Sequence, residues 1–100
     1  MKGRCNMKVM ISQPMNGLTD EEIKAVREEV IKVINPEWKV LNTLFDVEFD
    51  NPIYYLAKSI EKLAEADVVI FVPGWEKARG CKIEYEIAKA YGKFILIMGT

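Results

Sequence analysis

Strand-like and helix-like segments alternate along this 100-residue chain, and this alternation restricts the possible folds more than any other feature of the sequence. Strands that take turns with helices are typical of a parallel sheet, because each helix carries the chain back to the edge where the next strand begins. We therefore expect one α/β domain over residues 1–100, with residues 1–6 as a flexible extension. Four short apolar segments are the expected strands, at residues 7–11, 38–42, 67–72 and 94–98.

Capping signals predict where the first two helices begin. Thr19 and Glu22 have the spacing of a capping box, which predicts a helix from there to about residue 35. Asn51 followed by Pro52 predicts the start of a second helix that runs to about residue 66. A third helix is expected over about residues 81–91. We expect the second helix to bury one apolar face, formed by Ile53, Leu56, Ile60 and Leu63.

We predict an open parallel sheet with strand order 2-1-3-4 and helices on both faces, as in flavodoxin-like and Rossmann-like folds. In this order the chain changes direction between the first and third strands, and α/β sheets bind ligands at such a switch point, beyond the carboxyl ends of the strands. The loops at residues 12–17 and 73–80 meet there. The apolar edge at residues 94–98 favours a homodimer or a higher homo-oligomer, since a partner subunit would cover it.

The composition excludes several function classes. With 14 basic and 15 acidic residues, the chain offers no electrostatic basis for binding nucleic acid or an anionic membrane. It has no histidine and two cysteines, so a histidine-activated nucleophile and an ordinary structural zinc site are both excluded. No apolar run approaches the length of about 18–20 residues that crosses a bilayer. We expect a cytoplasmic protein that uses no metal or cofactor and works through carboxylates.

Glu84 is the strongest catalytic candidate. On a helical wheel with Ile83 at zero, Glu84 falls at about 100°, between Ile87 at about 40° and Ala88 at about 140°. An inward-facing carboxylate in the first turn of a helix at the switch point is well placed for the ligand crevice. The alternative is that Glu84 only complements the helix dipole. The same dipole would keep the carboxylate ionised, as a nucleophile requires.

The segment at residues 66–97 contains ADVVIFV and then WEKARGCKIEYEIA, and the first expected strand runs into the loop ISQPMNG. These motifs resemble the nucleoside 2-deoxyribosyltransferase superfamily, most closely its short, uncharacterised members, many of them phage-encoded. In that superfamily a glutamate four residues after the loop glycine attacks the anomeric carbon of a deoxyribose and displaces the base. Glu84 matches this glutamate and Gly80 the glycine. The resemblance implies a covalent glycosyl-enzyme that water or a second base then resolves.

Two positions depart from the pattern of the superfamily. Members that transfer nucleosides carry aspartate or serine two residues before the loop glycine, where this chain has Ala78. They also carry an aspartate that binds or protonates the base eight residues before the aspartate matched by Asp67, and this chain has Ser59 there. Protonation of the leaving base would then fall to another carboxyl group. The candidates are Asp46, Glu48, Asp50 and Glu76.

The two loops supply the expected substrate-binding residues. In the first loop, sugar contacts are expected from Ser12, Gln13, Asn16 and Gly17, whose alternative role is to satisfy the turn. In the second loop, contacts with the substrate are expected from Gly74, Trp75, Arg79 and Gly80. Trp75 would either stack on the base or pack as a lid or subunit contact. Arg79 would either bind a 5′-phosphate at the helix N-terminus or remain an exposed charge. We expect Cys81 to be a buried apolar residue and Asp67 to be structural.

The leading hypothesis is an enzyme, a deoxyribosyltransferase or a nucleoside (monophosphate) N-glycoside hydrolase. It would cleave or transfer at the N-glycosidic bond of a deoxynucleoside or its 5′-monophosphate, through a glycosyl intermediate on Glu84. The alternative is a non-catalytic module on the same fold that binds a nucleotide or a nucleotide-derived signal. A flavodoxin-like redox protein is disfavoured, because Ser12 and Gly17 are too far apart for a flavin phosphate loop.

Overall fold

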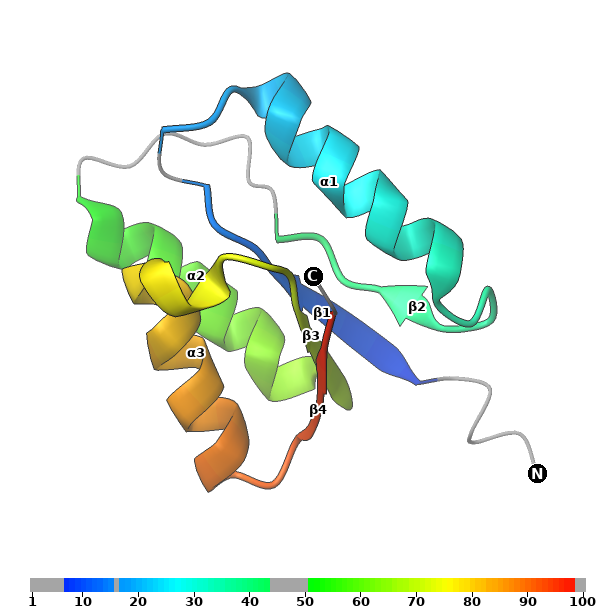
Figure 1. The fold of residues 1–100 in the computed structure, drawn as a ribbon. Helices are drawn as coiled ribbons and strands as arrows, with labels where there is room; N and C mark the ends of the chain where they lie inside the picture. The colour runs from blue at the N-terminus through cyan, green and yellow to red at the C-terminus, as the bar shows by residue number, and fades with distance from the viewer. Residues whose placement is uncertain (1–6, 16, 44–50, 99–100) are drawn as a thin grey trace.

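The computed structural model describes residues 7–15, 17–43 and 51–98. Over these ranges the chain forms a four-stranded, all-parallel sheet with the order β2-β1-β3-β4 (Figure 1). This confirms the α/β class and the strand order expected for a flavodoxin-like or Rossmann-like fold. The strands are β1 (Lys8–Ser12), β2 (Lys39–Val40), β3 (Val68–Phe71) and β4 (Phe94–Ile97), and the helices are α1 (Asp20–Val33), α2 (Pro52–Glu65) and α3 (Arg79–Ala90), with a 3-10 turn η2 (Trp75–Lys77) before α3.

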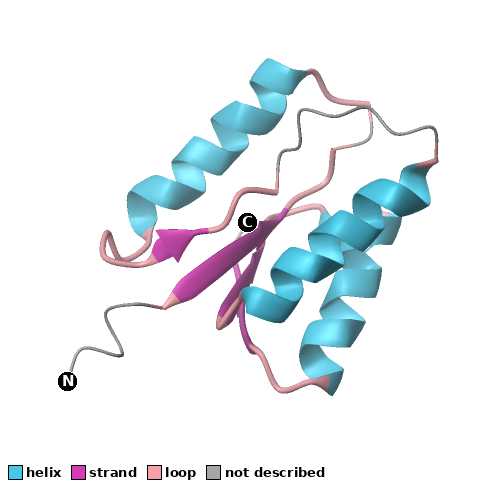
Figure 2. Cartoon of the chain, turned by 180° about the vertical axis from the view of Figure 1, so that it is seen from behind, coloured by secondary structure: helices cyan, strands magenta, loops and turns pink. Residues whose placement is uncertain are grey.

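The helices cover both faces of the sheet, as expected. In Figures 1 and 2, α1 lies on one side of the strands and α2 and α3 lie together on the other. Alternate side chains of β1 enter the two cores, because successive residues of a strand point to opposite faces. Val9 and Ile11 pack in the core that contains Val30 of α1, whereas Met10 packs in the core that contains Leu63 and Ala88.

The centre of the sheet is the parallel pair β1 and β3, which brings two loops together. The register runs from Val9 opposite Val68 to Ser12 opposite Phe71, and every residue of β3 is buried. Such a nearly continuous apolar run is typical of a central parallel strand. The loops that follow Ser12 and Phe71 therefore begin side by side at the carboxyl edge of the sheet, where the switch point was predicted.

Both predicted helix starts with side-chain caps are confirmed. The Thr19 backbone N–H donates to Glu22 Oε1 at 2.9 Å, and the Glu22 N–H donates to Thr19 Oγ1 at 3.1 Å. Asn51 Oδ1 accepts a 2.9 Å hydrogen bond from the Ile53 N–H at the start of α2. Helix α1 ends at Val33, slightly earlier than predicted.

The start of α3 differs from the prediction. The helix begins at Arg79, so Arg79 and Gly80 belong to its first turn and not to the preceding loop. The cap residue is Ala78, which is extended and has no side-chain oxygen to mark the helix start in the sequence. Glu84 consequently lies in the second turn of α3, where the influence of the helix dipole has fallen off.

The expectation that Ile53 would be buried is wrong, since its side chain is 68% exposed. Helix α2 has 14 residues and is about 21 Å long, whereas the four residues of β3 span about 13 Å. The first turn of α2 therefore extends past the sheet, and the buried part of the helix lies nearer its end, at Leu63.

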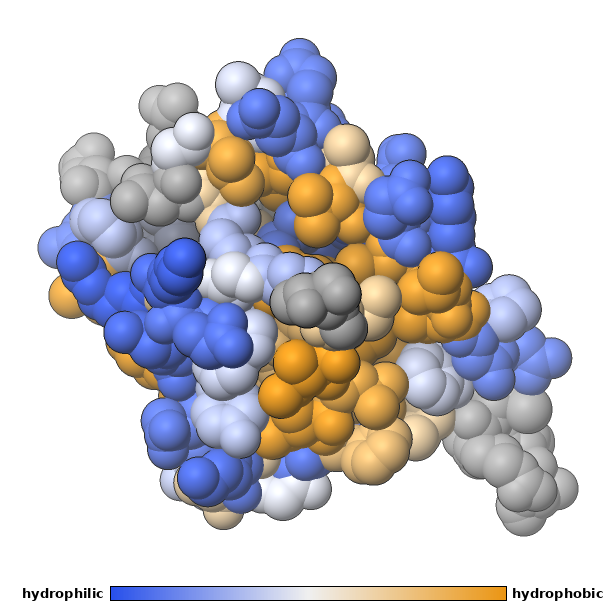
Figure 3. All heavy atoms as spheres, viewed as in Figure 1, coloured by the Kyte–Doolittle hydropathy of each residue, from blue (hydrophilic) through white to orange (hydrophobic). Residues whose placement is uncertain are grey.

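Strand β4 forms an apolar edge of the sheet. Phe94 is 57% exposed and Ile97 is similarly exposed. Orange atoms in Figure 3 surround the place where Figure 1 shows β4. Within the described ranges, no helix has both the length and the apolar character needed to span a membrane.

Candidate functional site

The carboxyl group of Glu84 is buried where three elements meet. Glu84 is 6% exposed, and its Oε1 accepts a 2.6 Å hydrogen bond from the hydroxyl of Ser12, the last residue of β1. The hydroxyl of Ser59, on α2, is also hydrogen-bonded to this carboxyl group. Residues from β1, α2 and α3 thus enclose Glu84 beside the carboxyl end of β1, as the wheel predicted for an inward-facing side chain.

Burial controls the protonation of this carboxyl group. Loss of hydration raises the pKa of Glu84 above its ordinary value, and the hydrogen bonds from Ser12 and Ser59 oppose that rise with smaller effects. The expectation that the helix dipole would keep Glu84 ionised is therefore wrong. Glu84 lies in the second turn of α3, where the helix dipole has little effect, and desolvation has the largest influence on its pKa.

The neighbouring thiol group is neutral at ordinary pH. Cys81 is buried, one turn before Glu84 on α3. Burial is the main reason that the pKa of Cys81 is raised to about 11; the hydrogen bond with Ser12 lowers it, and the charge of Glu84 raises it further. The prediction that Cys81 is a buried residue is confirmed, and its thiol group is not activated for reaction.

In the first loop, the polar side chains make hydrogen bonds within the protein. Ser12 is bound to Glu84, and Gln13 Nε2 donates a 3.0 Å hydrogen bond to the Ile23 carbonyl oxygen of α1. Gln13 Oε1 is buried and has no partner among the described residues. Gly17 has a φ of 83°, in the region that favours glycine, with open space around it. Asn16 lies outside the described residues, as do the proposed proton donors Asp46, Glu48 and Asp50.

The second loop contacts the first loop through Gly74. Gly74 has a φ of 94°, and a Cβ atom on it would lie 3.6 Å from Pro14 Cγ. The next residue, Trp75, is partly buried and stacks on Tyr85, with 4.7 Å between ring centroids; it also meets Phe71 at 5.2 Å. Its Nε1 is buried without a hydrogen-bond partner among the described residues. Trp75 therefore packs as a lid over this cluster, and one face of its indole is already occupied.

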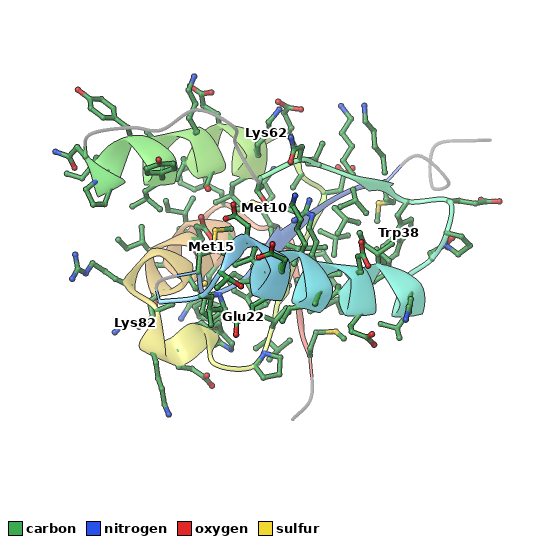
Figure 4. The ribbon with its side chains drawn as sticks, turned by 90° about the horizontal axis from the view of Figure 1, so that it is seen from above. Met10, Met15, Glu22, Trp38, Lys62 and Lys82 are labelled. Carbon is green, nitrogen blue, oxygen red and sulfur yellow. The ribbon has the colours of Figure 1, made fainter. Side chains whose placement is uncertain are left out.

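The two remaining second-loop candidates lie in the first turn of α3. Arg79 is exposed. Gly80 faces α2, because a Cβ atom on it would lie 3.8 Å from Leu56 Cδ1. Gly80 thus serves the contact between two helices, and its role toward a substrate stays a prediction. Figure 4 shows Lys82, from the same turn of α3, directed to the outside of the molecule, while Met10 lies in the interior.

One residue that contacts Glu84 and one buried charged residue of α1 were missed or given other roles. Ser59 was considered only because the superfamily carries an aspartate at this position, yet its hydroxyl group contacts Glu84. Arg27 on α1 is buried; it donates through Nη1 to Thr43 Oγ1 at 3.1 Å and through Nη2 to the Leu41 carbonyl oxygen. Its burial lowers its pKa. The spacing of Arg27 from the core residues of α1 was the available signal, since it follows Ile23 by one turn.

Asp67 has the structural role expected of it. Its Oδ2 accepts a 2.9 Å hydrogen bond from the Lys8 N–H at the amino end of the sheet, away from Glu84. Among the residues in the described ranges, no group of three histidine, cysteine, aspartate or glutamate side chains is placed to hold a metal ion.

The fold and the site together define a small parallel α/β protein with the buried carboxyl group of Glu84 at the switch point of its sheet. The chain belongs to the family described as Domain of unknown function (DUF4406), whose match covers residues 7–97. A comparison with curated proteins found no match.

Proposed function

We propose that this protein cleaves or transfers the N-glycosidic bond of a deoxynucleoside or its 5′-monophosphate, with Glu84 as the nucleophile. The observation that carries the proposal is the buried Glu84 carboxyl group, held by the Ser12 hydroxyl group at 2.6 Å beside the switch point. Burying an ionisable group costs stability, and carboxyl groups with perturbed pKa values gather at functional sites. The resemblance to the nucleoside 2-deoxyribosyltransferase superfamily supports nucleosides as the substrates.

The reaction has two steps, as in retaining glycosidases. The ionised Glu84 attacks C1′ of the sugar, the C1′–N bond breaks, and its electron pair leaves with the base. Water or a second base then attacks C1′ and releases the carboxylate. Because Oε1 accepts the hydrogen bond from Ser12, Oε2 is the attacking oxygen.

The loops around Glu84 supply the candidate binding groups for the rest of the substrate. The first loop, with Gln13 and Gly17, would lie along the sugar, and Trp75 would meet the base at the open part of its indole. Arg79 is exposed in the first turn of α3, where a 5′-phosphate would gain from its charge and from the helix N-terminus. We expect the reaction to occur in the cytoplasm, where a buried thiol such as Cys81 stays reduced.

The same proposal includes a homodimer or a higher homo-oligomer that covers the β4 edge. The exposed Phe94 is the support for this arrangement. Replacing Phe94 by lysine should lower the mass measured by light scattering in solution. Ile53→Lys is the matched control, since Ile53 is an exposed apolar residue on a different element, helix α2. Equal masses for the wild type and both variants would contradict this part of the proposal.

A second candidate function is a non-catalytic nucleotide-binding module. It is favoured by the raised pKa of Glu84, since a protonated carboxyl group can donate a hydrogen bond to a ligand but cannot attack it. Ligand binding without reaction would be seen as a rise in melting temperature, because a ligand that binds the folded state stabilises it.

The deciding experiment measures base release from a panel of deoxynucleosides and their 5′-monophosphates, with and without an acceptor base. We expect release by the wild type, none by Glu84→Gln, and full activity in Glu86→Gln. Glu86 is the matched control because it lies exposed on the same helix. Thermal stabilisation by nucleotides without base release would reject the enzyme and favour the binding module.

A further inference from the structure

Among the described residues, the groups that contact Glu84 are poor proton donors at neutral pH. Ser12 and Ser59 contribute hydroxyl groups, and Cys81 contributes a thiol with a pKa of about 11. An effective general acid has a pKa near the working pH. These side chains can therefore hold and orient the nucleophile, but they cannot hand a proton to a departing base.

This environment limits the kind of base that can leave. A neutral purine or pyrimidine departs as an anion unless it is protonated, whereas a base with a positive charge at its glycosidic end departs as a neutral molecule. Building on the proposed function, we infer that the site favours N-glycosides of cationic bases, either pyridinium rings or N7-alkylated purines, over ordinary nucleosides.

Charge complementarity supports the same substrate class. Glu84 and Arg27 are the buried charged side chains of the described ranges, and the Arg27 guanidinium group is bonded to Leu41 and Thr43. No described cation thus pairs with Glu84. A cationic base placed beside this carboxyl group would supply the missing positive charge, and it would favour the ionised nucleophile at the moment of binding.

Aromatic side chains next to this carboxyl group fit a cationic ring as well. Phe71 is the register partner of Ser12, and its ring meets Trp75 at 5.2 Å and Tyr85 at 5.5 Å. The faces of aromatic rings attract cations, tryptophan most strongly. Phe71 is fully buried, and Tyr85 stacks on Trp75 and already has Lys89 Nζ at 5.8 Å from its ring centroid. Trp75 is therefore the member of this cluster that is left to meet a positively charged base.

The reaction balances without an added proton. The Glu84 carboxylate and the cationic glycoside give a neutral glycosyl ester and a neutral base, as the C1′–Oε2 bond forms and the C1′–N bond breaks. Water then attacks C1′, the C1′–Oε2 bond breaks, and one proton passes to solvent. The products are the free sugar, the neutral base and the regenerated carboxylate.

The test compares pairs of substrates that differ in the charge of the base. One pair is 7-methyl-2′-deoxyguanosine and 2′-deoxyguanosine; the other is the 2′-deoxy form of nicotinamide riboside and its uncharged dihydro form. Each rate is corrected for spontaneous release and for release in Glu84→Gln. Because general acids contribute about 100-fold or more, we expect kcat/KM to be at least about 100-fold higher for the cationic member of the preferred pair. The preferred pair identifies the base as purine or pyridinium.

The possible failures can be told apart. Glu84-dependent release of base from 2′-deoxyguanosine within about 10-fold of the methylated substrate would overturn the inference and leave the proposed function standing. It would also mean that a general acid outside the described contacts serves the site. If the wild type releases no base from any of the four substrates, the inference and the proposed function both fail.

Discussion

The hydroxyl group of Ser12 donates a 2.6 Å hydrogen bond to Oε1 of Glu84, joining two residues that are 72 positions apart in the sequence. This bond connects the end of β1 with the second turn of α3. It fixes one oxygen of the buried carboxyl group and favours the ionised form against the effect of burial. Ser12 is therefore a positioning residue for Glu84 as well as a candidate for contact with the sugar.

Replacing Ser12 by alanine should move the activity of the protein to higher pH. The hydrogen bond lowers the pKa of Glu84, so its loss leaves the effect of burial less opposed and a smaller fraction of Glu84 ionised at neutral pH. Hydrogen bonds to charged groups contribute about 1.5–3 kcal/mol, so kcat/KM at neutral pH should fall about 10- to 100-fold. Ser59→Ala should move the pH profile in the same direction by less. An unchanged profile in Ser12→Ala would show that Ser12 does not control this carboxyl group.

Glu84→Gln should change how stability depends on pH. The pKa of Glu84 is raised on folding from an ordinary value of 4.5, so the folded state holds the proton more tightly than the unfolded state. The wild type should lose stability as the pH rises from 4.5 through the folded pKa, by about 1.4 kcal/mol for each pH unit in that window. The Glu84→Gln variant has no titrating group at this position and should not lose stability in this way.

Urea unfolding at several pH values measures the effect directly. The gain in unfolding free energy of Glu84→Gln over the wild type should grow with pH across this window and then level off. Glu86→Gln, the exposed control on the same helix, should give no such growth. A gain for Glu84→Gln that is the same at every pH would mean that Glu84 titrates alike in the folded and unfolded states.

Ser59→Asp should widen the range of substrates. An aspartate at this position places a second carboxyl group beside Glu84, and two neighbouring carboxyl groups raise the pKa of one of them so that it keeps its proton. The variant should therefore release base from neutral 2′-deoxyguanosine at least about 10-fold faster than the wild type. Ser59→Asn has the same size without the acid and should show no gain. Equal rates of base release from 2′-deoxyguanosine in the two variants would argue that the lack of a proton donor does not limit the reaction.

The two tryptophans allow ligand binding to be followed by fluorescence. Trp75 lies against the aromatic cluster beside Glu84, whereas Figure 4 shows Trp38 at the opposite end of the molecule from Met15 and Lys82. In Trp38→Phe, a cationic nucleoside should still quench the emission, because Trp75 remains. In Trp75→Phe the quenching should be lost and KM should rise by about 2- to 5-fold, since phenylalanine attracts a cation less strongly than tryptophan does. Quenching that persists in Trp75→Phe would place the ligand elsewhere.

Much of the fold could be predicted because its signals are local. The capping box of Thr19 and Glu22 depends on residues three positions apart, and the apolar run of β3 marks a central parallel strand by itself. The start of α3 was misplaced because its cap, Ala78, carries no capping side chain. Ile53 is exposed because α2 is longer than the strands it covers, and a local sequence pattern cannot predict this difference in length.

The candidate site was predictable in position but not in its electrostatics. The helical wheel indicated that Glu84 faces inward, and the strand order placed it near the switch point. The sign of its pKa shift depends on how α2 and α3 exclude water, and the bond to Ser12 joins distant parts of the sequence. The position of Glu84 within its helix favoured an ionised carboxylate stabilised by the helix dipole. Burial by the packing of the whole domain instead raises its pKa.

The central claim is that Glu84 forms a covalent bond to the sugar, and peptide mass spectrometry tests it most directly. The protein would be incubated with a 2′-fluorinated nucleoside of the preferred base, since the fluorine slows hydrolysis of the ester, then quenched in acid and digested. We predict that the peptide containing Glu84 gains the mass of one fluorinated sugar, and that Glu84→Gln gains none. Release of base with that peptide unmodified, or an adduct on any other residue, would contradict the account.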